Sequence, residues 1–263
     1  IKGDLAAAEP LCREALEVSR ETLGDRHPGT LCSMSNLGML LKERGDLGAA
    51  EPLVRDALQV RRETDGDRHP NTLCAMHNLG ILLKAKDDLA SAEPLLREAL
   101  GTSRETLGDR HPGTLASTNG LSKLLRAKGD FSAAEPLCRE ALEARRTTLG
   151  DRHPHTLDSL NNLGRLLKEK GDLAAAEPLS REALEGRREK LGARHPDTLS
   201  SISNLGLLLM AKGDLAAAEP LLREALDGRR EVLGARHPKT LAASKNLGAL
   251  GGNGRPRRSS RRR

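Results

Sequence analysis

Histidine is the residue type in this sequence that most suggests metal chemistry, because its imidazole ring is a common zinc ligand. The string Arg-His-Pro-x-Thr-Leu occurs six times at intervals of 42 residues, with its histidine at His27, His69, His111, His153, His195 and His237. Equivalent residues of successive copies are separated by at least the packing distance of two helices, about 8–10 Å. The ligands of one zinc ion all lie about 2 Å from it. We therefore expect a structural role for these histidines, and we predict no metal site and no cofactor.

The four cysteines are the next candidates for chemistry. Cys12 and Cys138 occupy one position of the 42-residue period, and Cys32 and Cys74 occupy another. The other copies place Val, Leu, Ser, Ala or Asp at these positions, a variety that favours packing or surface roles over ligands or nucleophiles. The sequence has no Cys-x-x-Cys pair, no phosphate-binding glycine loop and no nucleophile elbow. We expect neither catalytic activity nor a small-molecule substrate.

The net charge of +6 arises at the C-terminal end. Residues 251–263 contain six arginines and no acidic residue, whereas residues 1–250 have equal numbers of basic and acidic side chains. The sequence has no Trp, no Tyr and one Phe, so it lacks the aromatic residues on which nucleic-acid bases stack. Contact with nucleic acid, or nuclear import, is therefore expected only through this Arg-rich tail. Its simple composition also fits a disordered, low-complexity end.

The 42-residue period predicts the architecture, because a supersecondary unit that cannot bury its apolar face alone stacks on its neighbours. We expect an all-α fold, an α-solenoid of antiparallel helix pairs, over residues 1–250. It would consist of a partial first repeat, five complete helix pairs and a partial last repeat, followed by the tail at 251–263. Gly66 and its counterparts one period apart fit a left-handed residue that closes a helix.

The helix boundaries of one repeat follow from its apolar spacing and its capping residues. Helices are predicted over residues 28–44 and 47 to about 64, with His27 and Asp46 as N-caps. Pro52 lies inside the second helix and predicts either a kink or a re-started first turn. The residues expected to face the core are Met34, Leu37, Gly38 and Leu41 in the first helix and Leu47, Ala50, Val54, Ala57 and Leu58 in the second.

Residues 36–38 (Asn-Leu-Gly), 45–46 (Gly-Asp) and the small or apolar residues that follow resemble the tetratricopeptide repeat. The joining string Leu-Gly-Asp-Arg-His-Pro-x-Thr and the phrase Ala-Glu-Pro-Leu-Cys-Arg-Glu-Ala-Leu at 8–16 are similar to the kinesin light chain subtype. The resemblance implies a right-handed superhelix that acts as an adaptor or scaffold for proteins. Two departures are that aromatic core residues usual in the family are replaced here, and that residues 119–122 read Asn-Gly-Leu-Ser.

The resemblance also implies where binding takes place. The first helices would line the concave groove, with the fifth, ninth and twelfth residues of each copy, counted from the Leu of the six-residue string, opposite the core. The family places at the fifth position an asparagine that binds the backbone of a peptide, and the residues that match it are Asn119 and Asn161. The other fifth-position candidates are Ser35, His77 and Ser203.

Four cations are expected close to these asparagines, namely Lys123, Arg126, Arg165 and Lys168. Cations beside backbone-binding amides predict a groove for an extended acidic peptide. Cations at the twelfth position also complement the C-terminal end of a helix, which explains Arg126 and Lys168 but not Lys123 or Arg165. The many Arg-Glu steps elsewhere are interpreted as exposed helix surface with weak ion pairs.

The sequence thus predicts a protein–protein interaction module that binds a protein or peptide ligand. No apolar run approaches the roughly 20 residues that cross a bilayer, so we expect no membrane partner and a cytoplasmic location. Two alternatives remain open at this point. One is contact with nucleic acid or the nuclear-import machinery through the Arg-rich tail, and the other is a sensor portion of a larger signalling protein.

Overall fold

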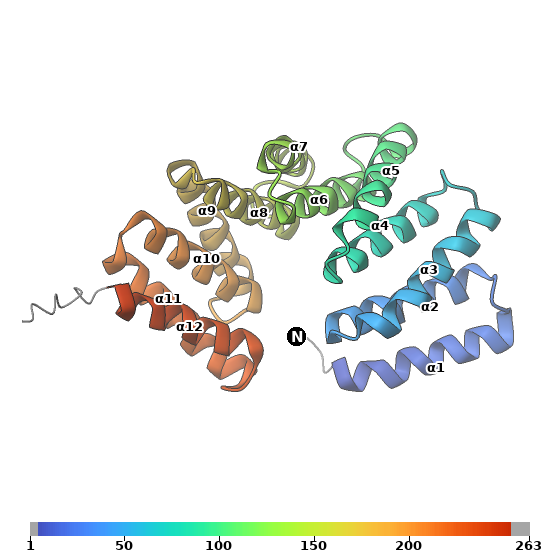
Figure 1. The fold of residues 1–263 in the computed structure, drawn as a ribbon, viewed down its shortest axis with the longest axis horizontal. Coiled ribbons are helices and arrows are strands. Elements are labelled where there is room, and N and C mark those ends of the chain that lie inside the picture. Colours follow the sequence, from blue (N-terminus) through green and yellow to red (C-terminus); the bar gives the residue numbers. More distant parts are fainter. Residues whose placement is uncertain (1–4, 254–263) are drawn as a thin grey trace, which may run out of the picture. The chain divides into compact units, whose positions relative to one another are not determined.

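The computed structural model describes residues 5–253, apart from the side chains of residues 6 and 251–253. These residues form twelve α-helices and no strand; within the first six helices, and within the last five, each helix packs on the next one along the chain (Figure 1). The helices are α1 (Leu5–Leu23), α2 (Pro28–Arg44), α3 (Leu47–Thr64), α4 (Pro70–Ala85), α5 (Leu89–Leu107), α6 (Pro112–Ala127), α7 (Phe131–Leu149), α8 (Pro154–Lys170), α9 (Leu173–Leu191), α10 (Pro196–Lys212), α11 (Leu215–Leu233) and α12 (Pro238–Asn253). The all-helical paired architecture is as predicted. Helix α12 continues three residues past residue 250, and residues 254–263 of the tail lie outside the described range.

The Arg-His-Pro-x-Thr-Leu string is a helix-initiating corner. In α2, His27 is the N-cap, and its Nδ1 accepts a hydrogen bond from the Gly29 backbone N–H at 3.1 Å. The proline follows at the first helical position, where a missing N–H costs nothing. The threonine is buried, and in α4 the Thr72 hydroxyl donates to the backbone carbonyl of Arg61 near the end of the preceding helix. The histidine and the threonine of the string therefore satisfy helix termini, which is the structural role expected for the histidines, whereas its arginine forms an ion pair, as Arg26 does with Glu63.

Two kinds of glycine separate the helices. Gly45 follows the predicted end of α2 and has the left-handed conformation (φ 91°, ψ 1°), and Asp46 caps α3, as predicted, by accepting from the Ala49 N–H at 3.1 Å. The glycines after the second helices also have positive φ, but Gly108 has ψ 161° instead of the left-handed value. The prediction of a left-handed closing residue was therefore wrong at Gly108, and likewise at Gly192 and Gly234, whose ψ values are 163° and 159°. Only glycine adopts this extended mirror region readily, so the positions still require it.

The core consists of the apolar stripes of paired helices. Met34, Leu37, Gly38 and Leu41 are buried as predicted, and so are the inward residues of α3 with one exception. Leu47 is only half-buried, because it is the first residue of its helix. Helix α3 runs through Pro52 without ending and restarting, and Pro52 lies on the exposed side beside exposed Gly48. The Gly48 carbonyl, which loses its helical partner at Pro52, therefore faces water.

The helices form two compact units, residues 1–137 and residues 138–263. In the N-terminal unit, first helix α2 contacts α4 and α4 contacts α6; in the C-terminal unit, α8 contacts α10 and α10 contacts α12. Among the described residues, neighbouring second helices do not approach as closely, and long side chains join them, as in the ion pair of Arg62 and Glu98. Because neighbouring first helices lie closer together, each unit curves with its first helices on the inner side.

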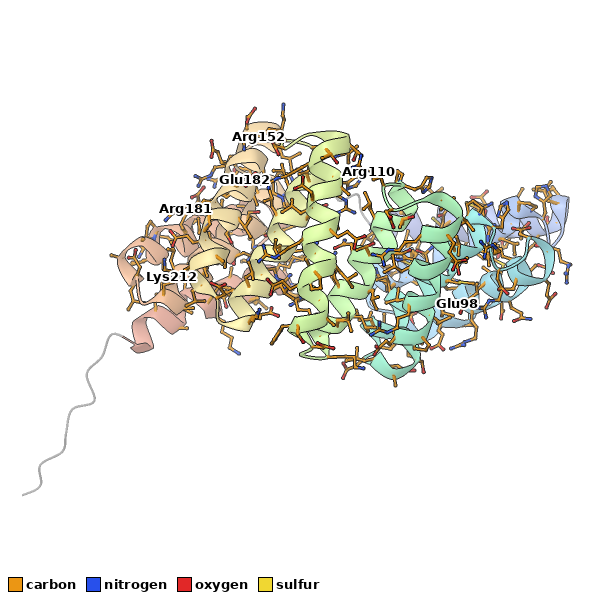
Figure 2. The ribbon with its side chains drawn as sticks, turned by 90° about the horizontal axis from the view of Figure 1, so that it is seen from above. Glu98, Arg110, Arg152, Arg181, Glu182 and Lys212 are labelled. Atoms are coloured by element: carbon orange, nitrogen blue, oxygen red, sulfur yellow. The ribbon has the colours of Figure 1, made fainter. Side chains whose placement is uncertain are left out.

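Ion pairs connect successive repeats on the outer surface. Glu177 of α9 binds Arg181 one turn later and Lys212 at the end of α10, and Figure 2 labels both cations. Glu51 and Glu93 have the same two kinds of partner. Arg146 and Glu182 pair in the same manner between two second helices, at 2.7 Å. The Arg-Glu steps are therefore exposed, as interpreted from the sequence, but they pair between repeats as well as along one helix.

These glutamates predict an acid-sensitive component of stability. Hydrogen bonds from Lys212 and Arg181 hold the pKa of Glu177 below its usual value of 4.5, and the pKa values of Glu51 and Glu93 are lowered by equivalent partners. A carboxylate with a lowered folded-state pKa stabilises the fold above its unfolded-state pKa and loses that contribution as pH falls. We expect the midpoint temperature of thermal unfolding to decrease as the pH is lowered from about 5 to about 3. The decrease should be smaller in the triple variant E51Q/E93Q/E177Q. If the midpoint temperature, measured by circular dichroism, changed equally with pH in the wild type and in the triple variant, this expectation would be wrong.

Candidate functional site

The predicted binding residues all lie on first helices. From α2 to α10, the residues described at the fifth, ninth and twelfth positions of the first helices are half-buried, except Ser203, which is 5% exposed. They are less exposed than a free helix surface because the neighbouring first helices flank them. In the N-terminal unit α2, α4 and α6 carry Ser35, Lys42, His77, Asn119, Lys123 and Arg126, and in the C-terminal unit α8 and α10 carry Asn161, Arg165, Lys168 and Ser203.

His77 is the point in the N-terminal unit where three first helices come together. The pKa of its imidazole is lowered to about 4, mainly by burial and in addition by the ammonium groups of Lys123 and Lys42. Those two lysines lie on α6 and α2, on either side of α4. Lys42 also pairs with Glu43 at 2.8 Å. The inner face of this unit therefore brings two cations close to an imidazole that is neutral at pH 7.

A glycine allows this approach. A Cβ atom at Gly120 of α6 would lie 2.7 Å from Cε1 of His77 and 3.4 Å from Cδ1 of Ile81. The copies before and after have asparagine at this position, Asn78 and Asn162. The departure from the repeat pattern at residues 119–122 thus makes room for the ring of His77. Sequence reasoning noticed the departure but did not connect it with His77.

In the C-terminal unit, Asn161 has a side-chain partner on the next first helix. Nδ2 of Asn204 donates a hydrogen bond to Oδ1 of Asn161 at 2.8 Å. Asn204 was not among the predicted site residues, because it stands at the sixth position of its copy, where asparagine recurs. The pair orients the amide of Asn161. Asn119, Lys123 and Arg126 belong to the N-terminal unit. The predicted cluster of these residues with Asn161, Arg165 and Lys168 therefore remains a prediction.

Other chemistry has little support among the described residues. Within residues 5–253, no group of three or more His, Cys, Asp and Glu side chains could hold a metal ion. The four cysteines are free thiols, with Cys32 and Cys74 exposed, Cys12 half-buried and Cys138 buried. None of the helices in the described range is both long and apolar enough to cross a membrane.

His77 makes the stability of the N-terminal unit sensitive to mild acid. An unfolded imidazole takes up a proton near pH 6.5, whereas His77 in the fold does so only near pH 4. The unfolded state therefore binds more protons between these values, and stability is lost as pH falls through this window. We expect the free energy of unfolding, measured with urea from pH 7 to pH 5, to decrease less with falling pH in His77→Gln than in the wild type. A slope unchanged in His77→Gln, or equally altered in a variant of the exposed His155, would contradict this.

Models of the tetratricopeptide repeat match most of the chain. One model matches residues 1–63, 45–105, 82–147 and 124–189, and a second matches residues 198–239. Among curated proteins, none matches the sequence. The matched segments run through the first and second helices alike, so the family model and the helix pairs agree on the repeating unit.

Similar solved structures have the same fold. A Podosopora anserina protein, described as a kinesin light chain with nearly identical tetratricopeptide-like repeats, is 25% identical, with a TM-score of 0.67 over 78% of this chain and 97% of that one. BtubC (BKLC) from P. vanneervenii is 24% identical, with a TM-score of 0.71 over 90% and 95%. NprR in complex with its cognate peptide NprX is 16% identical, with a TM-score of 0.66 over 96% and 68%. On the matches at residues 1–189 and 198–239, this chain belongs to the tetratricopeptide repeat family.

Proposed function

We propose that this protein is an interaction module that binds an extended acidic segment of a partner protein along its first helices, without catalysis of its own. The family assignment supports the general role of a scaffold. The likeness to a protein described as a kinesin light chain supports an adaptor, and NprR, which has a similar fold, is crystallised with a peptide. The identity of the partner, the cytoplasmic location and membership of a larger signalling protein remain predictions.

The observation that carries the proposal is the convergence of Lys42 and Lys123 on His77. The two ammonium groups lie close enough to lower the pKa of the imidazole, and we infer from this a positive potential around His77 on the inner face of the N-terminal unit. Carboxylates of a ligand would reduce the repulsion among these groups and form charge-assisted hydrogen bonds. Because the positions are half-buried, such bonds would be less screened by water than pairs on the outer surface.

The asparagines would act on the main chain of the ligand. An amide side chain supplies both a donor and an acceptor, so it can bind the N–H and C=O of one peptide unit whatever its side chain. Asn119 and Asn161 stand at the fifth position of successive copies. Main-chain binding of this kind gives affinity for an extended segment, while the cations at the ninth and twelfth positions, Lys123, Arg126, Arg165 and Lys168, would select its acidic residues.

The test is an array of 12-residue peptides that differ only in their number of Asp and Glu residues, probed with the full chain. We expect capture to increase with acidic content and to fall about tenfold or more in K123E/R165E, because two attractive pairs become repulsive. The control K190E/R223E makes the same change of net charge on second helices α9 and α11. Equal loss in the control, or undiminished capture by K123E/R165E, would refute the groove.

The Arg-rich tail supports a separate candidate function that stays a prediction, because residues 254–263 lie outside the described range. An arginine arm binds phosphates through charge, so its affinity falls steeply as salt rises. RNA or DNA binding that disappears on deletion of residues 254–263, and that weakens between 50 and 200 mM salt (about the range over which such binding collapses), would favour it. Binding of the acidic peptides that the shortened chain retains would favour the groove.

A further inference from the structure

A recessed cavity of about 230 Å³ lies in the N-terminal unit between α4, the end of α5 and the start of α6. Its wall includes the buried residues Leu73, Ser103 and Ser117, and exposed Cys74 is at its rim. Pockets that hold drug-sized ligands have volumes of about 300–1,000 Å³. This cavity is smaller and mostly apolar, which suits a single side chain.

The repeats themselves show which side chain the position accepts. Ser103 is the third of six equivalent residues one period apart, and four of the six are buried arginines: Arg61, Arg145, Arg187 and Arg229. In the C-terminal unit, Nη1 of Arg187 donates to Oγ of Ser201 at 2.7 Å and to the backbone carbonyl of Asp197 at 3.1 Å. Nη1 of Arg145 makes the same two bonds, to Ser159 at 2.7 Å and to His155 at 3.3 Å.

The cavity keeps the acceptors of this arrangement and lacks the arginine. The counterpart of Ser159 and Ser201 is Ser117, and the counterpart of the carbonyl-bearing residues His155 and Asp197 is Gly113. Both Ser117 and Gly113 line the cavity. The corners that begin α6 and α10 have the same N-cap backbone, φ −64° and ψ 139° at both histidines. The acceptors are therefore presented as they are where an arginine fills the site.

A third polar atom of the lining has no assigned role. His77 lines the cavity, and its Nδ1 is buried without a hydrogen-bond partner among the described residues. Its lowered pKa keeps the ring neutral at pH 7, so Nδ1 can accept a hydrogen bond and does not repel a cation as imidazolium would. A buried acceptor without a partner is unfavourable, and a donor placed in the cavity would relieve it.

We propose that this cavity binds the guanidinium group of an arginine side chain supplied by a partner protein. The guanidinium takes the place that Arg145 and Arg187 occupy in their own repeats, with Ser117, the Gly113 carbonyl and His77 as acceptors. This binding site shares His77 with the acidic-peptide groove, but its other two acceptors lie at the start of α6, so either proposal can fail without the other.

The charged groups around the cavity determine how tightly it is expected to bind a guanidinium group. Arg187 also pairs with Asp158, but the counterpart of Asp158 at the cavity is Cys74. Lys42 and Lys123 on either side of His77 repel a further cation. Burial without a carboxylate is tolerated elsewhere in this chain, because Arg229 is buried with the Leu199 carbonyl as its acceptor. We therefore expect weak binding of a small guanidinium compound, with a Kd of about 1 mM or above.

The test is a titration of the ¹⁵N-labelled full chain with N-propylguanidinium, compared at constant ionic strength with N-propylurea and pentylammonium. The urea has the same shape without the charge, and the ammonium has the charge without the planar donors. We expect saturable shifts of the Gly113 and Ser117 amides that are largest and tightest for the guanidinium. Equal binding of the three probes, or no saturable shift with the guanidinium, would overturn the proposal.

Three variants locate the binding. Ser103→Arg fills the cavity from within, so it should abolish the shifts and raise the thermal midpoint. Ser117→Ala leaves the cavity open without its hydroxyl acceptor and should weaken binding severalfold. Cys74→Asp supplies the carboxylate that Asp158 provides to Arg187 and should tighten binding about tenfold. Should Ser103→Arg fail to fold, the other two still decide, because unchanged affinity in both would place the probe elsewhere.

Discussion

Replacement of Arg187 with alanine is expected to lower the local free energy of unfolding of the C-terminal unit by about 2–4 kcal/mol. The change removes the donor to the buried Ser201 hydroxyl and to the Asp197 carbonyl, and it leaves a cavity where the side chain was. A buried polar group that loses its partner bears its full desolvation cost. Native-state hydrogen exchange in α9 and α10 measures the effect, because stacked repeats do not unfold in one step.

The other arginines of this position provide graded controls. Arg229 has alanine, Ala243, where Arg187 has Ser201 as an acceptor, so Arg229→Ala should cost less. Replacement of the exposed Arg223 on α11 with alanine should change the free energy of unfolding by no more than about 0.5 kcal/mol. Equal costs for Arg187→Ala and Arg223→Ala would show that the buried guanidinium contributes no stability. The comparison with the cavity at Ser103 would then lose its energetic basis.

Gly38→Ala is expected to destabilise the second repeat by about 1–3 kcal/mol. A Cβ atom at Gly38 would lie 2.4 Å from Cγ2 of Val54 and 3.3 Å from the carbonyl oxygen of Ala50. Val54 is fully buried, and its β-branched side chain has one strongly preferred rotamer in a helix. The helices must therefore separate, which reduces packing along the α2–α3 contact. Exchange rates of the α2 and α3 amides report the loss.

Gly164→Ala is the matched control for this variant. The nearest atom to its added Cβ is the Ser180 hydroxyl at 2.8 Å, and a serine side chain can rotate away. Both substitutions gain the same helix propensity, about 1 kcal/mol for alanine over glycine in a helix interior, so their difference reports the steric conflict. We expect Gly164→Ala to be close to neutral. An equal or smaller cost for Gly38→Ala would mean that helix spacing is not set by this glycine.

Much of the backbone could be predicted because it depends on local chemistry that repeats. His27 caps α2, Asp46 caps α3, and Gly45 stands between them; each acts within a few residues of its own helix end. The bounds of α2 and α3 match the sequence expectation, since apolar spacing and caps together mark both ends. The glycine after each second helix was predicted less well, because positive φ follows from the residue type but ψ depends on how the next helix packs.

The candidate site could be predicted by position but not by contact. The fifth, ninth and twelfth residues lie on the first helices as expected, yet the approach of Lys42 and Lys123 to His77 depends on the spacing of three helices. The room that Gly120 leaves for the imidazole and the Asn161–Asn204 bond are likewise contacts between repeats. The cavity at Ser103 was missed although its signal is in the sequence: Ser103, like Ser19, stands where the four other repeats have a buried arginine.

The central claim is that first-helix residues bind an acidic segment, and the most direct test is the location of a bound peptide. An acidic peptide captured on the array would be titrated into the ¹⁵N-labelled full chain and its amide shifts mapped. The account predicts shifts on α4, α6, α8 and α10 around the fifth, ninth and twelfth positions, including Asn119 and Asn161. Shifts confined to the second helices α5, α9 and α11, or to the Arg-rich tail, would contradict it.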